Sequence, residues 1–245
     1  MHNTVDQTKA ASIMEVYSNR PTRGRRQVQM QLERQYDLHM SLGSVHRYMS
    51  ILDIRSKRIR KYPNKAKETQ DLPRTFPNVL GQDFRVSLQP KWLTDITFLP
   101  CRDGLLYLSC IKDLRDKSII AYAISTSNDL QLVLDTLEKA KSYIYPGIIL
   151  HSDRGVQYCS RAYHRYLQEH GMIGSMSRKA NPQDNAPMES FFSTLKNEEL
   201  KQHSHRSMAQ TRLCIKWFIE YYNMNRPQWN LKKLTPFEFR NQLQT

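Results

Sequence analysis

Residues 92–124, WLTDITFLPCRDGLLYLSCIKDLRDKSIIAYAI, contain three apolar runs that short polar turns separate. The runs span residues 92–99, 105–111 and 118–124. Short runs of this kind, joined by equally short turns, predict an antiparallel meander of three strands. The middle of the chain is therefore expected to start a β-sheet, with Asp95 inside its first strand.

The segments that follow alternate between helix and strand. Apolar spacing predicts helices at 130–141, 162–170 and 186–200 and short buried strands at 148–151 and 172–175. The resulting order, βββαβαβα, is that of a ribonuclease-H-like core. The fold class expected is α/β, with a five-stranded mixed sheet flanked by helices.

The chain is strongly basic, and its charge is unevenly distributed. It has 245 residues with 37 Lys+Arg against 23 Asp+Glu, a net charge of +14, and an isoelectric point near 9.7. Residues 1–74 carry +8, residues 75–195 carry +1 and residues 196–245 carry +5. A nearly neutral centre with basic flanks indicates a packed core whose ends bind a polyanion.

Several classes of protein are disfavoured by the sequence. No run approaches the ~18 apolar residues of a membrane span, and the N-terminus lacks the apolar segment of a secretory signal. The four scattered cysteines, Cys101, Cys110, Cys159 and Cys214, form no CxxC pair. We therefore expect no membrane partner, no zinc ribbon and a reducing, cytoplasmic location.

Residues 1–54 show helical spacing with polar turns, and Ser41 and Ser44 are candidate caps for a last helix that holds His46 and Arg47. This pattern predicts a helix-turn-helix-like segment. The basic stretch RSKRIRKYPNKAK begins a linker over 55–77, which could be a solvated spacer, a phosphate-binding arm or both. The candidate DNA-binding residues here are Arg47, Arg55, Lys57, Arg58, Arg60 and Lys61.

Three carboxylates stand at chemically suggestive positions. Asp95 lies among apolar residues of a strand, Asp153 follows the strand 148–151, and Glu189 lies one turn into the helix 186–200. Each has a structural alternative, such as a turn, a cap or a favourable helix-dipole contact. Carboxylates that converge repel one another unless they bind cations, and hard oxygen ligands suit Mg²⁺ or Mn²⁺. Two such ions can support in-line attack on a phosphodiester.

The motifs WLTDITFL, HSDRGVQY and SMSRKANPQDNAPMESFFSTLKNE resemble the catalytic core of insertion-sequence transposases of the IS-three family, specifically the second-reading-frame product. That core is similar to retroviral integrase. The ending YYNMNRPQWNLKKLTPFEF resembles the family's tail motif, and residues 10–60 resemble its helix-turn-helix segment more loosely. Gln228, Ala180 and the stretch TRGRRQVQMQL depart from the family pattern.

The resemblance implies a catalytic triad of Asp95, Asp153 and Glu189, with 35 residues between the last two. It also implies a basic residue seven positions after the glutamate, here Lys196. Seven residues at ~100° each nearly complete two turns, so Lys196 should share a helix face with Glu189. A phosphate contact is expected of Lys196, against the alternative of an ion pair with Glu199.

These features predict a DNA transposase that cuts and joins strands with two divalent cations, Mg²⁺ or Mn²⁺. The expected partners are double-stranded DNA (element ends and target), further copies of the chain on DNA, and an upstream-frame protein or fusion. A bacterial, nucleoid-associated location follows. A non-catalytic DNA-binding regulator and a ribonuclease-H-like nuclease without joining activity are the alternatives. The domains expected are 1–54, 55–77, a catalytic core at 78–200 and a helical extension at 201–245.

Other residues suggest structural roles. His151 is expected to pack at a strand end or support the carboxylates rather than bind a hard cation. His203, His205 and Cys214 lack a fourth ligand for zinc. Trp217, Phe218, Tyr221 and Tyr222 recur at helical spacing and are expected in the core.

Overall fold

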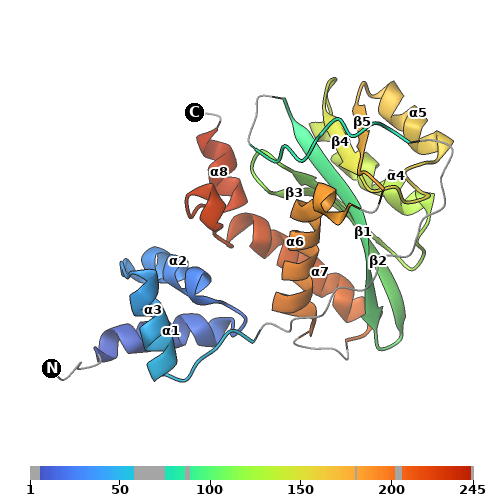
Figure 1. The fold of residues 1–245 in the computed structure, drawn as a ribbon. Coiled ribbons are helices and arrows are strands. Elements are labelled where there is room, and N and C mark those ends of the chain that lie inside the picture. The colour runs from blue at the N-terminus through green and yellow to red at the C-terminus, as the bar shows by residue number, and fades with distance from the viewer. Residues whose placement is uncertain (1–5, 58–74, 86–88, 180, 202–205, 244–245) are drawn as a thin grey trace.

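The computed structural model describes residues 6–57, 75–85, 89–179, 181–201 and 206–243. Three short helices at the N-terminal end form a separate small bundle (Figure 1). They are α1 Gln7–Asn19, α2 Arg25–Tyr36 and α3 Leu42–Ile51. Ser41 caps α3 as predicted, because its hydroxyl accepts a hydrogen bond from the Ser44 N–H at 3.1 Å. The apolar stripes of the three helices enclose a core of their own, which includes Ile13, Val28 and Val45.

The sheet of the larger part contains the predicted meander. Its strands are β1 Lys91–Cys101, β2 Gly104–Asp113, β3 Ile119–Ser125, β4 Ile149–Ser152 and β5 Ile173–Met176. The spatial order is β3-β2-β1-β4-β5. The first three strands are antiparallel neighbours, whereas β4 runs parallel to β1 and to β5. The predicted five-stranded mixed sheet flanked by helices is confirmed.

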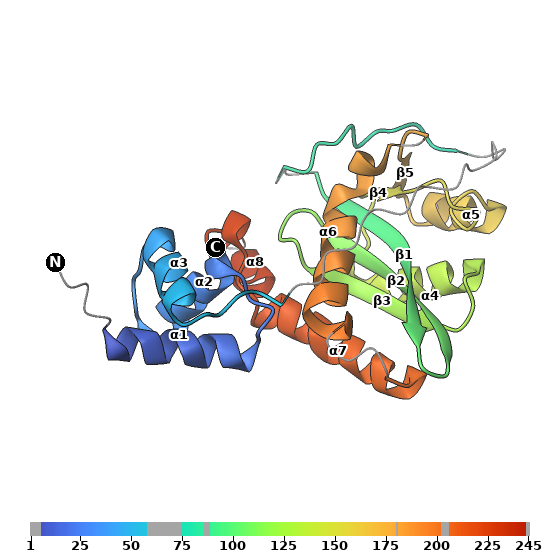
Figure 2. The same ribbon diagram turned by 60° about the horizontal axis from the view of Figure 1, so that its bottom comes forward.

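Each face of the sheet carries its own hydrophobic layer. On one face, α4 (Leu130–Ala140) and α5 (Arg161–Glu169) pack on a core that includes Trp92 and Leu150. On the other, α6 (Ala186–Leu195) and α7 (Met208–Met224) pack on a core that includes Leu93. Figure 2 shows the two helical layers on opposite sides of the strands. Alternation along β1 thus assigns neighbouring residues to opposite cores.

The helix predicted at 186–200 changes character near its end. It is α-helical only to Leu195 and continues as a π-helical turn, Lys196–Leu200. A π-turn accommodates an additional residue per turn, so side chains after Lys196 lie at angles that α-helical spacing does not predict. The chain then passes through α7 and a short 3₁₀ turn, Trp229–Leu231, to α8, Pro236–Gln242.

The small bundle packs against this C-terminal part. In both views α2 lies between α3 and α8 (Figures 1 and 2). Among the described residues, no helix is both long and apolar enough to span a bilayer.

Candidate active site

The pairing of β1 with β4 brings Asp95 and Asp153 together. Leu93 pairs with His151 in the parallel register. Extending that register by two residues places Asp95 beside Asp153, which directly follows the last residue of β4. Because side chains two residues apart share a face of a strand, Asp95 belongs to the face of β1 on which Leu93 packs against α6 and α7, and Asp153 lies at the end of the neighbouring strand. Two residues 58 positions apart therefore meet at the carboxyl end of a parallel strand.

Helix α6 adds Glu189 on the same face of the sheet. The helix packs along β1 through Phe191, Phe192 and Leu195, and Glu189 lies in its first turn on the exposed side. At the end of α6, the Lys196 ammonium donates to the Thr97 hydroxyl and lies 5.0 Å from the centre of the Phe98 ring. Helix α6 is thus attached to β1 two residues beyond Asp95.

All three carboxyl groups are harder to ionise than free carboxyl groups. Burial raises the pKa of Asp95 well above its ordinary value, and the negative charges of Asp153 and Glu189 raise it further. The charge of Lys196 acts in the opposite direction on the pKa of Asp95. Desolvation also raises the pKa of Asp153 and of Glu189. Three oxygen-donor groups that resist ionising side by side are the donor set that a hard divalent cation stabilises.

The fit to such a cation rests on this donor set rather than on a closed ligand shell. Across the part of the chain that the structure describes, no three His, Cys, Asp or Glu side chains are arranged to hold a metal ion as they stand. Asp95 accepts a hydrogen bond from the Ile96 N–H at 2.8 Å, and Asp153 accepts one from the Gly155 N–H at 2.9 Å. The carboxylates are therefore held by their own backbone and leave further oxygen lone pairs free for a ligand.

Two positions that the sequence analysis did not single out hold this arrangement in place. A Cβ atom on Gly155 would lie 3.0 Å from the Asp153 Oδ1, so glycine lets the turn close around the carboxylate. Asp184, fully buried just before α6, accepts hydrogen bonds from Arg178, Asn78 and Gln82. The bonds from Arg178, more than any other cause, keep the pKa of Asp184 well below its ordinary value.

The sequence offered only weak signals for these positions. A glycine two residues after a candidate ligand is a common turn residue, and two of the partners of Asp184, Asn78 and Gln82, lie more than 100 residues upstream. Asn185 was also missed. Both of its side-chain amide atoms are buried, and they have no hydrogen-bond partner among the described residues.

His151 has a structural role. It is fully buried, and its two ring nitrogens lie 2.9 Å and 3.1 Å from the hydroxyls of Ser175 and Ser177. Burial lowers the pKa of His151 to about 4. The predicted packing at the strand end is therefore observed. His203 and His205 lie outside the described residues.

One expectation about the aromatic residues was wrong. Phe218 and Tyr222 are buried in the core and Tyr221 packs partly against it, but the Trp217 residue is 70% exposed. Residues 217 and 218 differ by ~100° around the helix, so one faces the core while the other faces solvent.

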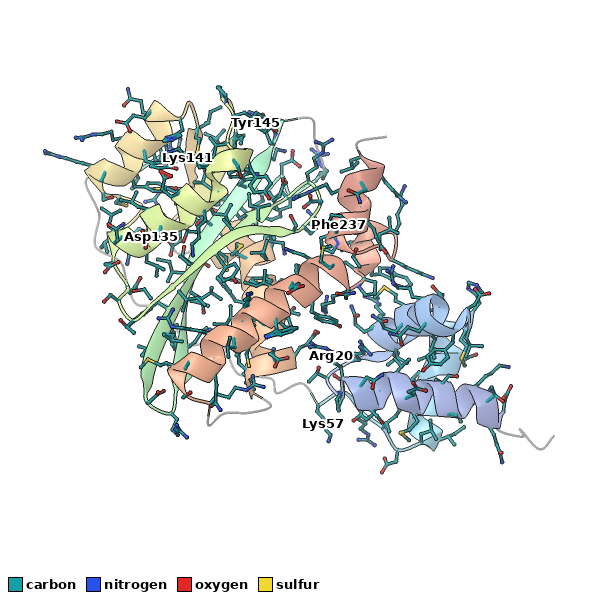
Figure 3. All side chains as sticks on the ribbon, turned by 180° about the vertical axis from the view of Figure 1, so that it is seen from behind. Arg20, Lys57, Asp135, Lys141, Tyr145 and Phe237 are labelled. Carbon is teal, nitrogen blue, oxygen red and sulfur yellow. The ribbon has the colours of Figure 1, made fainter. Side chains whose placement is uncertain are left out.

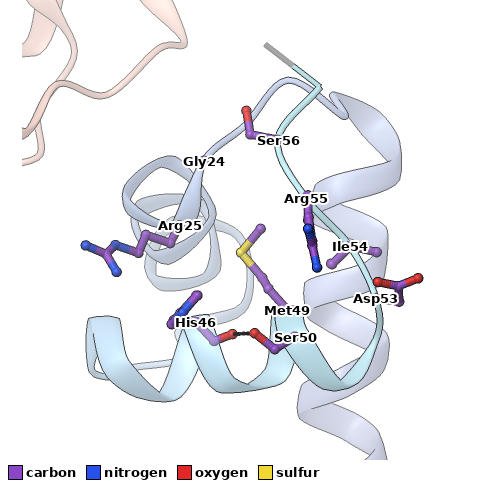
Figure 4. Close-up of a pocket in the computed structure, with 9 residues that line it drawn as sticks. All are labelled: Gly24, Arg25, His46, Met49, Ser50, Asp53, Ile54, Arg55 and Ser56. Carbon is purple, nitrogen blue, oxygen red and sulfur yellow. Dashed lines mark hydrogen bonds between the residues drawn. The ribbon is translucent and has the colours of Figure 1, made fainter.

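Three of the candidate DNA-binding residues, Arg47, Arg55 and Lys57, lie on the small bundle. Arg47 is exposed on α3, with its guanidinium 5.7 Å from the Tyr48 ring. Arg55 lines a pocket of about 360 Å³ together with Arg25, His46 and Met49 (Figure 4). The backbone N–H of Lys57 donates to Pro21 at 3.0 Å. Arg58, Arg60 and Lys61 lie outside the described residues, as does Ala180.

Known protein families match both the small bundle and the part of the chain that contains the sheet. Two families described as integrase core domains match residues 89–182 and 170–236. A family described as an HTH-like domain matches residues 4–62. The matched ranges coincide with the sheet, its helical layers and the small bundle.

Relatives of similar sequence are found in several bacteria. The chain is 37% identical over 238 residues to the putative transposase InsK for insertion element IS150 of Escherichia coli, with 94% of this chain and 82% of the relative covered. It is 35% identical over 200 residues to the transposase for insertion sequence element IS904 of Lactococcus lactis, with 80% and 78% covered. The transposase InsF for IS3A of Escherichia coli is 36% identical, with 77% and 66% covered.

Among solved structures, the fold is similar to the integrase catalytic core domain of HTLV-2 in complex with magnesium. The TM-score is 0.50 at 13% identity, covering 62% of this chain and 97% of that one. A simian T-cell lymphotropic virus intasome chain gives a TM-score of 0.50 at 12% identity, with 81% and 69% covered. At this level of identity the likeness concerns the fold alone.

Proposed function

Because this chain belongs to the insertion-sequence transposases that carry an integrase core domain, we propose that Asp95, Asp153 and Glu189 form its catalytic site for DNA cutting and joining. One observation carries this assignment. The parallel pairing of Leu93 with His151, extended by two residues, supports a position of Asp95 next to Asp153, and α6, which carries Glu189, packs on the same face of β1 as Asp95. The enzyme class is that of the polynucleotidyl transferases.

The carboxylates would hold two divalent cations, Mg²⁺ or Mn²⁺. When bound, such ions activate an attacking oxygen and stabilise the leaving 3′-oxygen of a phosphodiester. The protein holds the donors in place: the Gly155 N–H orients Asp153, and α6 keeps Glu189 over β1. No Ser or Tyr nucleophile is assigned, since strand transfer between two DNA ends needs no covalent protein–DNA intermediate.

The DNA itself would contact both parts of the protein. Lys196 lies beside the carboxylates, and its ammonium suits a phosphate near the cut as a point charge. Arg47 and Arg55 on the small bundle would bind the element end, with Lys57, Arg58, Arg60 and Lys61 along the linker. We propose the division 1–54, 55–77, 78–200 and 201–245, and assembly of several copies on paired DNA ends.

The assignment is tested by incubating the purified chain with labelled duplexes of its element ends and Mg²⁺ or Mn²⁺. Asp95→Asn, Asp153→Asn and Glu189→Gln should each abolish cutting and joining while DNA binding persists. Each replacement removes a charged ligand with little change in size. Asp135→Asn is the matched control, because this exposed aspartate lies on α4 at the opposite face of the sheet (Figure 3). Near-wild-type strand transfer by any of the three variants would refute the triad.

A further inference from the structure

The small bundle rests on the segment 225–238, which follows α7 and which we call the docking platform. Helix α2 meets it with a polar face. The side-chain amide of Gln27 donates to the Pro227 carbonyl at 2.9 Å, and that of Gln31 donates to the Asn225 carbonyl at 3.5 Å. Both glutamines are buried, and a spacing of four residues sets them on one helix face. Their hydrogen bonds therefore determine which residues of α2 contact the platform.

Ion pairs surround these buried contacts. The Lys233 ammonium lies 2.8 Å from both carboxylate oxygens of Glu33, and Arg34 makes a two-bond pair with Glu238. The Arg26 guanidinium lies 5.5 Å from the centre of the Trp229 ring. Opposite charges thus face one another on both sides of the interface, which selects one orientation of the bundle.

The platform is in turn attached to the helix of Glu189. Arg226, its second residue, makes a two-bond pair with Glu198 at 3.0 Å and 2.8 Å, and both residues are buried. Glu198 lies in the π-helical turn that continues α6. A continuous set of contacts therefore runs from α6 through Glu198 and Arg226 to Pro227, and from there to Gln27 on α2.

A second connection joins the same turn to α1. The next residue, Glu199, pairs with Arg206 at 3.1 Å and with Arg20 at 3.4 Å. The Arg20 guanidinium also lies 3.8 Å from the centre of the Tyr221 ring on α7. Figure 3 shows Arg20 at the junction between the bundle and α7. The two acidic side chains of the π-turn therefore make different contacts: Glu198 pairs with Arg226 of the platform, and Glu199 pairs with Arg20 at the end of α1.

Docking through α2 leaves the outer face of α3 free. His46, Arg47 and Ser50 on that face are exposed, whereas Val45, Tyr48 and Met49 pack inside the bundle. The residues that would contact DNA are therefore presented at a fixed position relative to Glu189.

We propose that the docking platform sets the distance between the sequence bound by α3 and the phosphate cut at the triad, and so determines where the cut falls. This inference rests on the proposed function. Geometry of this kind matters because a displacement of about 1 Å at a reacting phosphate can reduce the rate about 100-fold.

The test uses charge exchanges that leave the net charge unchanged. Glu33→Lys with Arg34→Glu turns both rim pairs into like-charge contacts, and adding Lys233→Glu with Glu238→Lys restores opposite charges. Glu138→Lys with Lys141→Glu, which exchanges an exposed pair far from the interface, is the control. Small-angle X-ray scattering of the full chain reports docking independently of activity, and sequencing gels of cut element ends report the position of the cut.

We expect the exchange at Glu33 and Arg34 to increase the maximum dimension of the protein in solution, because the bundle undocks. The affinity of the protein for a single element end should stay unchanged. The cut should spread over phosphates that neighbour the native position. Cutting at the native phosphate should fall about ten-fold or more, and the four-residue exchange should restore both readouts. An undocked variant that cuts at the native position and rate overturns the proposal. If the bundle of the variant exchanged at Glu33 and Arg34 stays docked, the variant Gln27→Glu with Gln31→Glu is measured next, because its carboxylates would face the carbonyl groups of the platform. If this variant also stays docked, the proposed role of the platform is refuted. A wild-type chain that cuts no DNA, either alone or fused to the upstream-frame segment, refutes the proposed function, while the scattering result still decides docking.

Discussion

Removal of one charge from the buried pair Glu198–Arg226 should destabilise the protein strongly. The side chains are 3% and 10% exposed, so neither charge can recover its hydration when the other is lost. Glu198→Gln keeps the size and one acceptor but leaves the guanidinium of Arg226 without a counter-charge. Breaking a buried pair in this way costs about 3 kcal/mol, a large part of the 5–15 kcal/mol that stabilises a typical domain.

The double variant Glu198→Gln with Arg226→Met separates charge from packing. Methionine fills much of the space of the arginine stem and leaves no buried cation. The double variant should therefore recover at least about half of the stability that Glu198→Gln loses, since apolar replacement of both partners is often nearly neutral. Arg226 also lies 5.8 Å from the Tyr222 ring, and loss of that contact limits the recovery.

Urea unfolding of the wild type, Glu198→Gln, Arg226→Met and the double variant, followed by circular dichroism, measures the free energy of unfolding of each protein, and the double-mutant cycle gives the coupling between the two residues. Arg85→Met is the control, because Arg85 makes an exposed ion pair with Asp83. A loss below about 1 kcal/mol for Glu198→Gln, the range of surface pairs, would show that this interior is accessible to water and refute the reasoning.

Three further outcomes follow from the site. Lys196→Ala should weaken DNA-end binding for all sequences and lower the slope of log affinity against log salt by about one, as salt titrations would show, whereas an unchanged slope would exclude a phosphate contact. Gly155→Ala should reduce strand transfer several-fold with binding intact, because the added methyl group would lie 3.0 Å from the Asp153 carboxylate; wild-type transfer rates would contradict this role. Asp184→Asn should lower the free energy of unfolding by about 2–3 kcal/mol near pH 7, because an amide cannot accept all the donors now bound. As the folded-state pKa of Asp184 lies below the ordinary 3.8, its contribution is complete above that pH and is lost as the pH falls, so the difference between wild type and variant should shrink in acid-dependent melts.

Periodicity predicted the strands well because strands depend on local pattern. The predicted strand 92–99 lies within β1, and Asp95 was conspicuous as the acid among apolar neighbours. The parallel register with β4 then explains why residues 58 apart in sequence meet. The sequence predicted both strands and the helix between them, but it did not predict which residues of the two strands pair.

The features that escaped prediction depend on distant partners. Gln27 and Gln31 resemble surface residues of a polar helix, and only the platform about 200 residues later explains their burial. The π-turn was missed because one additional residue in a helical turn leaves no compositional signal. Trp217 was misplaced because aromatic residues at 217, 218, 221 and 222 fit two overlapping helix faces.

The unequal lengths of β1 and β4 have a consequence for solubility. β4 ends at Ser152, so no strand among the described residues pairs with the β4 side of β1 beyond Asp95, and a strand of another molecule could add there. Every second residue of β1 presents its backbone N–H and C=O groups on that side. Two of these positions offer no free N–H to an incoming strand. The N–H of Ile96 donates to the Asp95 carboxylate, and Pro100 has no N–H. The carboxylate that we propose to be catalytic should therefore also hinder intermolecular pairing of the strand. An inactive reagent should accordingly carry Asp95→Asn, whose amide oxygen can still accept this bond, because Asp95→Ala would free the donor and promote aggregation.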